Sequence, residues 1–260
     1  TAVANGFDTL AAALTEAGLV SALEGEGPFT VFAPSEDAFA NLLTALEITA
    51  EDLLADPELA NILLFHVIEG EFYAEDVVEA APIILETLSG IYVTITVEEG
   101  NVFINGAQVI LADVPATNGV IHVIEEVILP PDNVVDTAVD NGAFTTLVAA
   151  LQETELDTVL AGEGPFTVFA PTDTAFAALL TELGLTAEEL LAYPFLADIL
   201  TYHVVPGYVF SSDIVAVGED FTVETVLGQE IEVTFADGHV YVDGAQVVIT
   251  DLVTSNGVIH

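Results

Sequence analysis

Apolar residues recur with helical spacing near the start of the chain and then give way to shorter, mostly apolar runs. Leu10, Leu14 and Leu23, with alanines between them, share one face of a helix, and residues 29–32 form a run that ends before Pro34. Spacings of three and four predict helices, whereas a short run closed by proline predicts a strand. A helix followed by a strand is therefore expected in the first 35 residues.

Further along, apolar and polar residues alternate strictly, which predicts half-buried strands. Apolar residues occupy positions 91, 93, 95 and 97, and turns follow at Glu99–Asn101 and at Asn105–Gly106. An Asn-Gly pair between apolar runs is a strong signal of a β-hairpin. The second half repeats the alternation at positions 231, 233 and 235, with turns at Asp237–Gly238 and Asp243–Gly244. Each half therefore predicts a meander of strands.

Helix starts are marked by hydroxyl residues followed by acids. A Ser or Thr side chain can accept hydrogen bonds from the free amides of the first helical turn, and acids there are favoured by the helix dipole. Four such N-caps are predicted: Ser35, Thr49, Thr172 and Thr186.

The same segments occur twice, in the same order. Residues 25–34 return almost unchanged as residues 162–171, residues 118–122 return as 256–260, and Thr1–Val3 return as 137–139. A period this long predicts two tandem domains, each with its own core. We place them at residues 1–131 and 132–260, because Pro130 and Pro131 cannot continue a central strand and Asp132 can cap a following helix.

The composition is extreme in one respect. The 260 residues include no Lys or Arg but 43 Asp and Glu, giving a formal net charge of −43, while 53% of the residues are hydrophobic. A chain with this share of hydrophobic residues is expected to fold. Because it has no Lys or Arg, it cannot neutralise the phosphates of a nucleic acid. The sequence thus excludes nucleic-acid binding, and it contains no apolar run long enough to predict membrane insertion. Without cysteine, it forms no disulfides.

The repeated motifs resemble those of the fasciclin-type (FAS1) adhesion domain. The first motif is found at residues 29–39 and 166–176, the second at 118–124 and 256–260, and a Tyr-His motif at Tyr202–His203. The resemblance implies an α+β fold of two tandem domains, each a β-wedge or sandwich of short strands flanked by helices. It also implies an extracellular or cell-surface location and roles in adhesion and matrix assembly without catalysis. Unlike copy one, copy two ends at His260, so its closing strand is expected to be missing from this sequence.

Two readings remain open for the Tyr-His positions, which are Phe65, His66, Tyr202 and His203. In the first, the histidines are core residues bonded to the backbone. In the second, they contact a partner, as the resemblance implies for this motif, although Phe65 stands where the family usually has Tyr. The sequence supports both.

The best candidate for a cation site is a set of acids at the domain junction. Asp132, Asp136 and Asp140 are spaced so that a helix would stack them on one side. Oxygen ligands suit Ca²⁺ and other divalent cations, yet the Asp-rich loop of an EF-hand is absent. The alternative is a solvated acidic face, and no cofactor is required in either case.

No pattern for a nucleophile, a phosphate-binding loop or a Schiff-base lysine is present, so we expect no enzymatic activity. The leading interpretation is a strongly anionic, cation-associated structural or adhesion protein whose units self-associate into extracellular fibres or a matrix, with a matrix or cell-surface partner. The alternative is a binding module for a receptor, a polysaccharide or a small hydrophobic ligand. Assembly state distinguishes the two.

Overall fold

The computed structural model describes residues 6–217 and 220–260 and divides the chain into two compact units. Unit 1 is Thr1–Pro130 and unit 2 is Pro131–His260. The sequence-based boundary lies one residue further along the chain. The repeat of residues 1–3 at 137–139 cannot be compared in the structure, because residues 1–3 lie outside the described residues.

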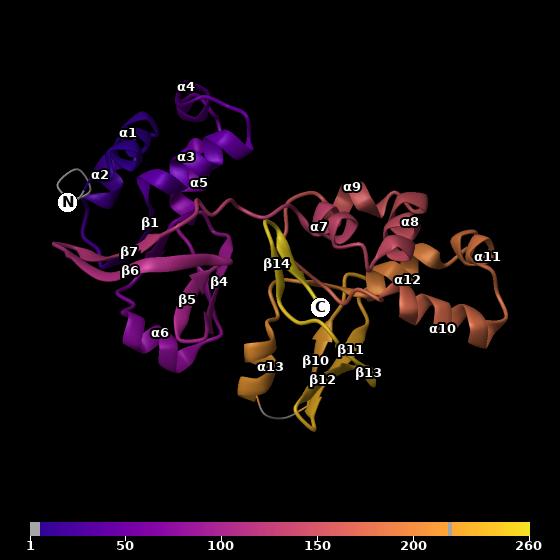
Figure 1. Ribbon diagram of the computed structural model, residues 1–260. Coiled ribbons are helices and arrows are strands. Elements are labelled where there is room, and N and C mark those ends of the chain that lie inside the picture. Colours follow the sequence, from indigo (N-terminus) through magenta and orange to yellow (C-terminus); the bar gives the residue numbers. More distant parts are fainter. Residues whose placement is uncertain (1–5, 218–219) are drawn as a thin grey trace. The chain divides into compact units, whose positions relative to one another are not determined.

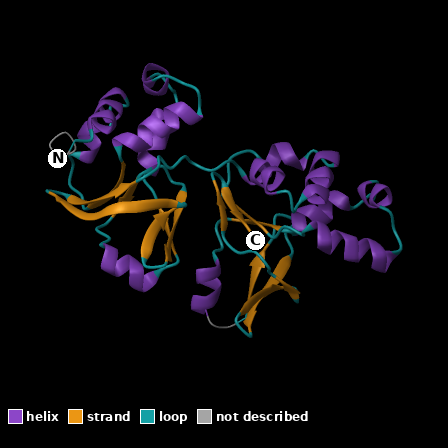
Figure 2. Ribbon diagram, in the orientation of Figure 1, coloured by secondary structure: helices purple, strands orange, loops and turns teal. Residues whose placement is uncertain are grey.

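Unit 1 places most of its helices on one side of its central strands and one helix at the other end, beside the meander (Figures 1 and 2). Its helices are α1 (Asp8–Glu16), α2 (Val20–Leu23), α3 (Glu36–Ala45), α4 (Ala50–Leu54), α5 (Leu59–Phe65) and α6 (Ala74–Ala80). Its strands are β1 (Phe29–Pro34), β2 (Val67–Glu69), β3 (Ile83–Glu86), β4 (Tyr92–Glu98), β5 (Asn101–Ile104), β6 (Ala107–Ala116) and β7 (Gly119–Ile124).

The strands of unit 1 form one sheet in the order β2-β1-β7-β6-β5-β4-β3. Strands β1 and β7 pair in parallel from Phe29 opposite Gly119 to Pro34 opposite Ile124. Strand β6 pairs with β7 through two register shifts around Leu111, and such irregularities bend a strand. The predicted meander is confirmed as the antiparallel order β3-β4-β5-β6.

Unit 2 repeats this arrangement with shorter strands. Its helices are α7 (Val134–Asn141), α8 (Thr145–Glu153), α9 (Leu156–Leu160), α10 (Asp173–Leu183), α11 (Ala187–Leu191), α12 (Leu196–Tyr202) and α13 (Ser211–Val217). Its strands are β8 (Phe166–Val168), β9 (Val204–Pro206), β10 (Phe221–Glu224), β11 (Glu230–Ala236), β12 (His239–Val242), β13 (Ala245–Gln246), β14 (Leu252–Thr254) and β15 (Gly257–Ile259). They form two sheets, β10-β11-β12-β13 and β14-β15-β8-β9, because β13 and β14 are separate where unit 1 has the continuous β6.

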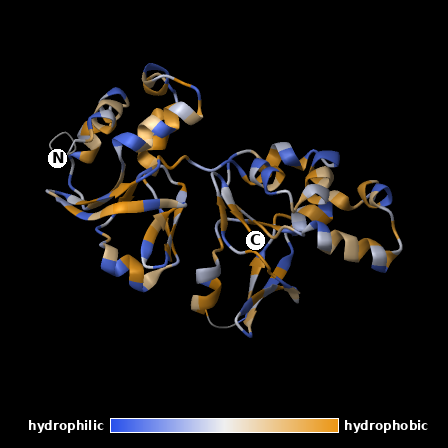
Figure 3. Ribbon diagram, viewed as in Figure 1, coloured by the Kyte–Doolittle hydropathy of each residue, from blue (hydrophilic) through white to orange (hydrophobic). Residues whose placement is uncertain are grey.

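The central strand pair of each unit is buried on both faces, as parallel strands in mixed folds usually are. All six residues of β7 are buried. One apolar cluster lies against the wedge and includes Phe32 and Ile124, while the other lies under the helices and includes Ala33 and Ile121. Hydrophobic residues accordingly recur along the central strands of both units (Figure 3).

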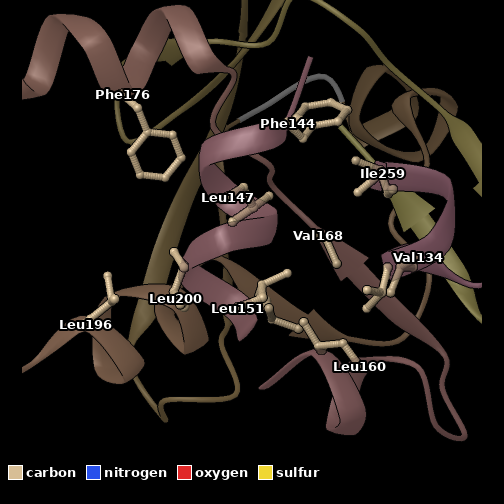
Figure 4. Packing of buried hydrophobic residues seen from close by; sticks show 14 of the residues in the cluster. Val134, Phe144, Leu147, Leu151, Leu160, Val168, Phe176, Leu196, Leu200 and Ile259 are labelled. Carbon is tan, nitrogen blue, oxygen red and sulfur yellow. The ribbon is translucent and has the colours of Figure 1, made fainter. Parts of the chain in front are cut away.

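In unit 2 the cluster under the helices is built around α8. Leu147 and Leu151 of this helix, Leu200 of α12 and Val168 of β8 belong to one buried cluster (Figure 4). Deleting a buried leucine from such a cluster typically costs 2–5 kcal/mol. Of the helical face predicted in unit 1, Leu10 and Leu14 of α1 pack in the corresponding cluster, whereas Leu23 lies in the separate helix α2.

All four predicted N-caps are confirmed. The side chains of Ser35, Thr49, Thr172 and Thr186 each accept a hydrogen bond from a backbone amide three residues ahead. At the start of α7, however, the cap is not Asp132. Asn133 holds this position, and its Oδ1 accepts from Val135 and Asp136 at 3.0 and 3.1 Å.

A second kind of cap joins helices that are distant in sequence. Asp173, at the start of α10, accepts hydrogen bonds from Thr145 Oγ1 at 2.7 Å and from the Thr146 amide at 2.7 Å, so it caps α8. The Thr145 hydroxyl above all holds the pKa of Asp173 at about 2. In unit 1 the same contact is made by Glu36, which accepts from the Thr9 amide at 2.9 Å and from its hydroxyl at 2.6 Å.

We predict that Asp173→Asn lowers the free energy of unfolding of unit 2 by about 1 kcal/mol, the usual cost of a lost cap. Because the folded pKa lies below the unfolded value, this stabilisation is present above about pH 4 and lost as the pH falls towards 2. Urea unfolding of both proteins, with amide exchange of residues 145–153 as the probe, measures the change in the free energy of unfolding of unit 2. The charge-matched control is Glu182→Gln on the exposed face of α10. Equal stability of the two variants at pH 7 would contradict the capping role.

Candidate functional site

The repeated motifs place polar side chains in the interior, between the central strands and the chain that follows β2 or β9. Thr30 of β1 is fully buried; its hydroxyl donates to Gly70 O at 2.8 Å and accepts from the Phe72 amide at 3.0 Å. It thus joins two segments about 40 residues apart. The same pair of hydrogen bonds recurs in unit 2, from Thr167 to Gly207 O at 2.7 Å and from the Val209 amide at 2.9 Å.

The histidine of the second motif contacts the same segment that Thr30 contacts, the one around Phe72 that follows β2. His122 Nδ1 accepts from the Asp113 amide at 3.3 Å, so Nε2 carries the proton and donates to Phe72 O at 2.8 Å. The imidazole is therefore neutral and fixed by two backbone groups. In unit 2, His260 makes the same contacts with Asp251 at 3.2 Å and Val209 at 2.8 Å. Burial lowers the pKa of His260.

The aspartate beside each of these histidines starts a helix. Asp113 has a φ of +59°, and its Oδ1 accepts from the Ala74 amide at the beginning of α6, at 3.0 Å. Asp251 has the same φ and accepts from the Ser211 amide at 2.8 Å and from the Ser211 hydroxyl, at the beginning of α13. Asp and Asn tolerate this left-handed conformation better than most residues. Each aspartate thereby ties β6 or β14 to a helix on the wedge.

The asparagine of the second motif closes the far end of the sheet. Asn118 Nδ2 donates to Leu23 O at 2.8 Å and to Gly25 O at 3.0 Å, and Asn256 makes the matching pair with Leu160 and Gly162. The glycine that follows is also required. Gly119 has a φ of +154°, and a Cβ there would overlap the carbonyl oxygen of Phe29.

His66 is buried, in agreement with the first of the two readings of the Tyr-His positions. Its Nε2 accepts from the Ile128 amide at 3.2 Å, so Nδ1 carries the proton and donates to Ile62 O at 2.7 Å. Burial lowers the pKa of His66 to about 4. Phe65 is also fully buried. Neither residue of this pair is available at the surface of unit 1, so a partner-binding role for them does not fit the structure.

In unit 2 the Tyr-His pair is half-buried and held by other groups. The Tyr202 hydroxyl donates to Asp243 Oδ2 at 2.6 Å, and this hydrogen bond is the main reason that the pKa of Tyr202 is raised. His203 Nδ1 lies 2.7 Å from Ile199 O. Where unit 2 has the Tyr202–Asp243 pair, unit 1 has Phe65 and Asn105. A partner-binding role for Tyr202 and His203 stays a prediction.

The three acids proposed as a cation site do not share one helical face. Helix α7 begins at Val134, so Asp132 precedes it, and its backbone carbonyl accepts from the Ser255 amide at 2.9 Å. Asp136 accepts from Asn133 Nδ2 at 2.6 Å. Within residues 6–217 and 220–260, no three His, Asp or Glu side chains are grouped to hold a metal ion. The expected stack fails because the cap at Asn133 starts the helix after Asp132.

A groove of about 640 Å³ lies in unit 1, between α1, α2, β1 and β7. Leu14, Leu23 and Asn118 are among its lining residues. The matching surface of unit 2 lies under α7, where Val134 is buried and its amide donates to Asn256 Oδ1 at 2.9 Å. The groove in unit 1 is therefore the counterpart of the surface that α7 covers in unit 2, and the recurrence of α7 residues 137–139, namely residues 1–3, lies outside the described residues.

Comparison with known proteins agrees with this geometry. The family model of the fasciclin domain matches residues 5–130 and 142–260. The chain belongs to the fasciclin domain family. The predicted α+β fold of two tandem fasciclin domains is thereby confirmed. None of the helices described is both long and apolar enough to cross a membrane.

Several fasciclin relatives are similar in sequence. Protein sll1483 of Synechocystis sp. is 50% identical over 129 residues, which are 48% of this chain and 68% of that protein. Transforming growth factor-beta-induced protein ig-h3 of Sus scrofa is 30% identical over 248 residues, 92% of this chain and 34% of its own length. Human periostin is 30% identical over 243 residues, 92% of this chain and 28% of its own length. The chain thus spans about a third of these two animal proteins.

Among solved structures, the FAS1 domain pair from the insect cell adhesion molecule fasciclin I has a TM-score of 0.48 and 20% sequence identity. The match covers 96% of this chain and 93% of that one.

Several of the residues that organise the motifs were not identified from the sequence. Thr30, Asp113 and Asn118, with their counterparts in unit 2, bond to backbone groups far away in the chain. In the sequence, these residues are marked only by their recurrence in both copies. Recurrence alone does not say which distant segment each side chain contacts.

We predict that the His66 imidazole of the folded chain titrates near pH 4, against a usual value of 6.5. Because the folded pKa is lowered, the contribution of His66 to stability is present above about pH 6.5 and is lost as the pH falls towards 4. Titration of the ring protons by NMR, assigned with His66→Gln, measures this value. A midpoint at pH 6 or above would show that the ring is open to solvent.

Proposed function

We propose that this chain is an extracellular or cell-surface structural module that acts in adhesion or matrix assembly through its surface. The carrying observation is that the motif side chains are already engaged inside the fold. Thr30, His122 and Asn118 each bond to backbone groups of other segments. The described part of the chain also leaves no buried side-chain nitrogen or oxygen without a partner. The chemistry open to other molecules is therefore that of the exterior, which combines carboxylates with exposed apolar side chains.

Membership of the fasciclin family supports an adhesive or matrix role, which the sequence resemblance also implies. The tandem arrangement supports a repeat unit, because contacts between successive copies that do not close on themselves generate a filament. The acidic exterior limits how two copies of the chain can contact each other. A chain without Lys or Arg cannot pair its carboxylates with side-chain cations of a second copy. Self-association through Lys or Arg ion pairs is therefore excluded, which favours apolar contacts or cations that bridge carboxylates.

We propose that bound Ca²⁺ or other divalent cations supply this bridging diffusely, over many carboxylates, instead of at one built site. Repulsion within a net charge of −43 is relieved by such ions as well as by simple screening. Association of copies then depends on the divalent ion and not only on ionic strength.

A second candidate function is that of a binding module. The Tyr202–His203 pair of unit 2, which is only half-buried, is the observation that favours this alternative. A module of this kind would remain a monodisperse particle.

We predict that calcium chloride drives the 260-residue chain into ordered polymers that a chelator disperses. Light scattering and electron microscopy follow the change at pH 7. The control is sodium chloride at the same ionic strength, which screens charge without bridging carboxylates and is expected to give much less polymer. A chain that stays monodisperse under both salts would reject the structural role and favour the binding module.

A further inference from the structure

Unit 2 exposes two aromatic side chains where unit 1 has two acids. Tyr193 and Phe195, in the turn between α11 and α12, are 44% and 59% exposed. Their ring centroids lie 6.0 Å apart with an interplanar angle of 63°, an edge-to-face arrangement. The corresponding residues of unit 1 are Asp56 and Glu58.

The aromatic residues are not needed to form this turn. In unit 1 the Leu59 amide donates to Asp56 O at 3.1 Å, and in unit 2 the Leu196 amide donates to Tyr193 O at 3.0 Å. The leucine that follows is buried in both units. Asp56 Oδ1 also accepts from the Glu58 amide at 2.8 Å, a contact that tyrosine cannot make. The same turn thus forms with acids in unit 1 and with aromatic rings in unit 2.

The surroundings of the two rings combine apolar and acidic groups. Ile199, four residues after Phe195, is 41% exposed, so it extends the apolar surface by one helical turn. Asp198, three residues after Phe195 in the first turn of α12, is an exposed acid. We call the set of Tyr193, Phe195, Ile199 and Asp198 the aromatic patch.

We propose that the aromatic patch is a docking site for a Lys- or Arg-rich segment of a partner protein. A cation over an aromatic face contributes about 0.5–1 kcal/mol at an exposed site, and a neighbouring carboxylate adds charge complementarity. A second copy of this chain has no Lys or Arg to place over the rings. The inference goes beyond the proposed function, because it concerns a heterologous partner and one unit only.

The test must separate the aromatic patch from the general attraction of an acidic protein for cations. The double variant Tyr193→Asp, Phe195→Glu does so, because it installs the residues of unit 1 and adds two negative charges. Diffuse electrostatics predicts equal or tighter binding by this variant, whereas the aromatic patch predicts weaker binding. Since unit 1 carries these acids on the same turn, the variant is expected to fold, which circular dichroism verifies.

The probe is a fluorescein-labelled twelve-residue peptide of alternating arginine and serine, titrated with the 260-residue chain at 150 mM salt. We expect about five- to tenfold weaker binding by the double variant, as the loss of about 1 kcal/mol or slightly more implies. The matched variant Asp56→Tyr, Glu58→Phe should tighten binding by creating a second patch in unit 1. Peptide binding should also slow amide exchange in residues 190–199 of the unmodified chain.

Three outcomes would overturn the proposal. Unchanged or tighter binding by the double variant would assign the affinity to diffuse charge. Equal binding of a peptide with glutamine in place of arginine would show an apolar site without cation recognition. Sedimentation that shows self-association of the unmodified chain without peptide, lost in the double variant, would make the patch a contact between copies.

Discussion

The absence of lysine and arginine constrains every polar group inside this fold. Buried polar atoms must be hydrogen-bonded, and buried charges need partners that this chain does not possess. The fold meets this condition with neutral side chains, namely buried threonine hydroxyls, buried uncharged imidazoles and a half-buried asparagine amide, each bonded to the backbone. The carboxylates that have structural roles, such as Asp173 and Asp113, instead accept from amides and hydroxyls at helix starts. Amide groups and helix dipoles thus do what cationic side chains do elsewhere.

These neutral links explain why the repeated motifs are arranged around the parallel pair of central strands. In unit 1, β1 carries Thr30 and β7 carries His122, and both hold the segment around Phe72 that follows β2. The glycine that opens β7 permits the close approach of the two strands, and the asparagine before it fixes the chain between α2 and β1. The motifs are therefore a framework, and differences between the two units lie elsewhere, at Phe65 and Tyr202 and on the turn before α12.

Much of this architecture follows from the sequence. Local chemistry identified the four helix caps and the meander, because both depend on neighbouring residues, and the repeat identified two domains of one family. The sequence could not show that Asn133, and not Asp132, caps α7, since either side chain can do so. Burial of Phe65 and His66 and the distant partners of Thr30 and Asp113 depend on tertiary contacts. The sequence does not single out the Tyr193–Phe195 pair, because two aromatic residues on either side of a proline are compatible with an ordinary turn whose rings are buried.

The central claim is that His66, His122 and His260 are neutral framework groups and not exposed recognition groups. Long-range nitrogen–proton NMR correlations of the imidazole rings at pH 7 test it most directly, since they show which ring nitrogen carries the proton. The account predicts a single Nε2–H tautomer for His122 and His260 and a single Nδ1–H tautomer for His66. Rings that average between tautomers, or that carry both protons, would contradict it.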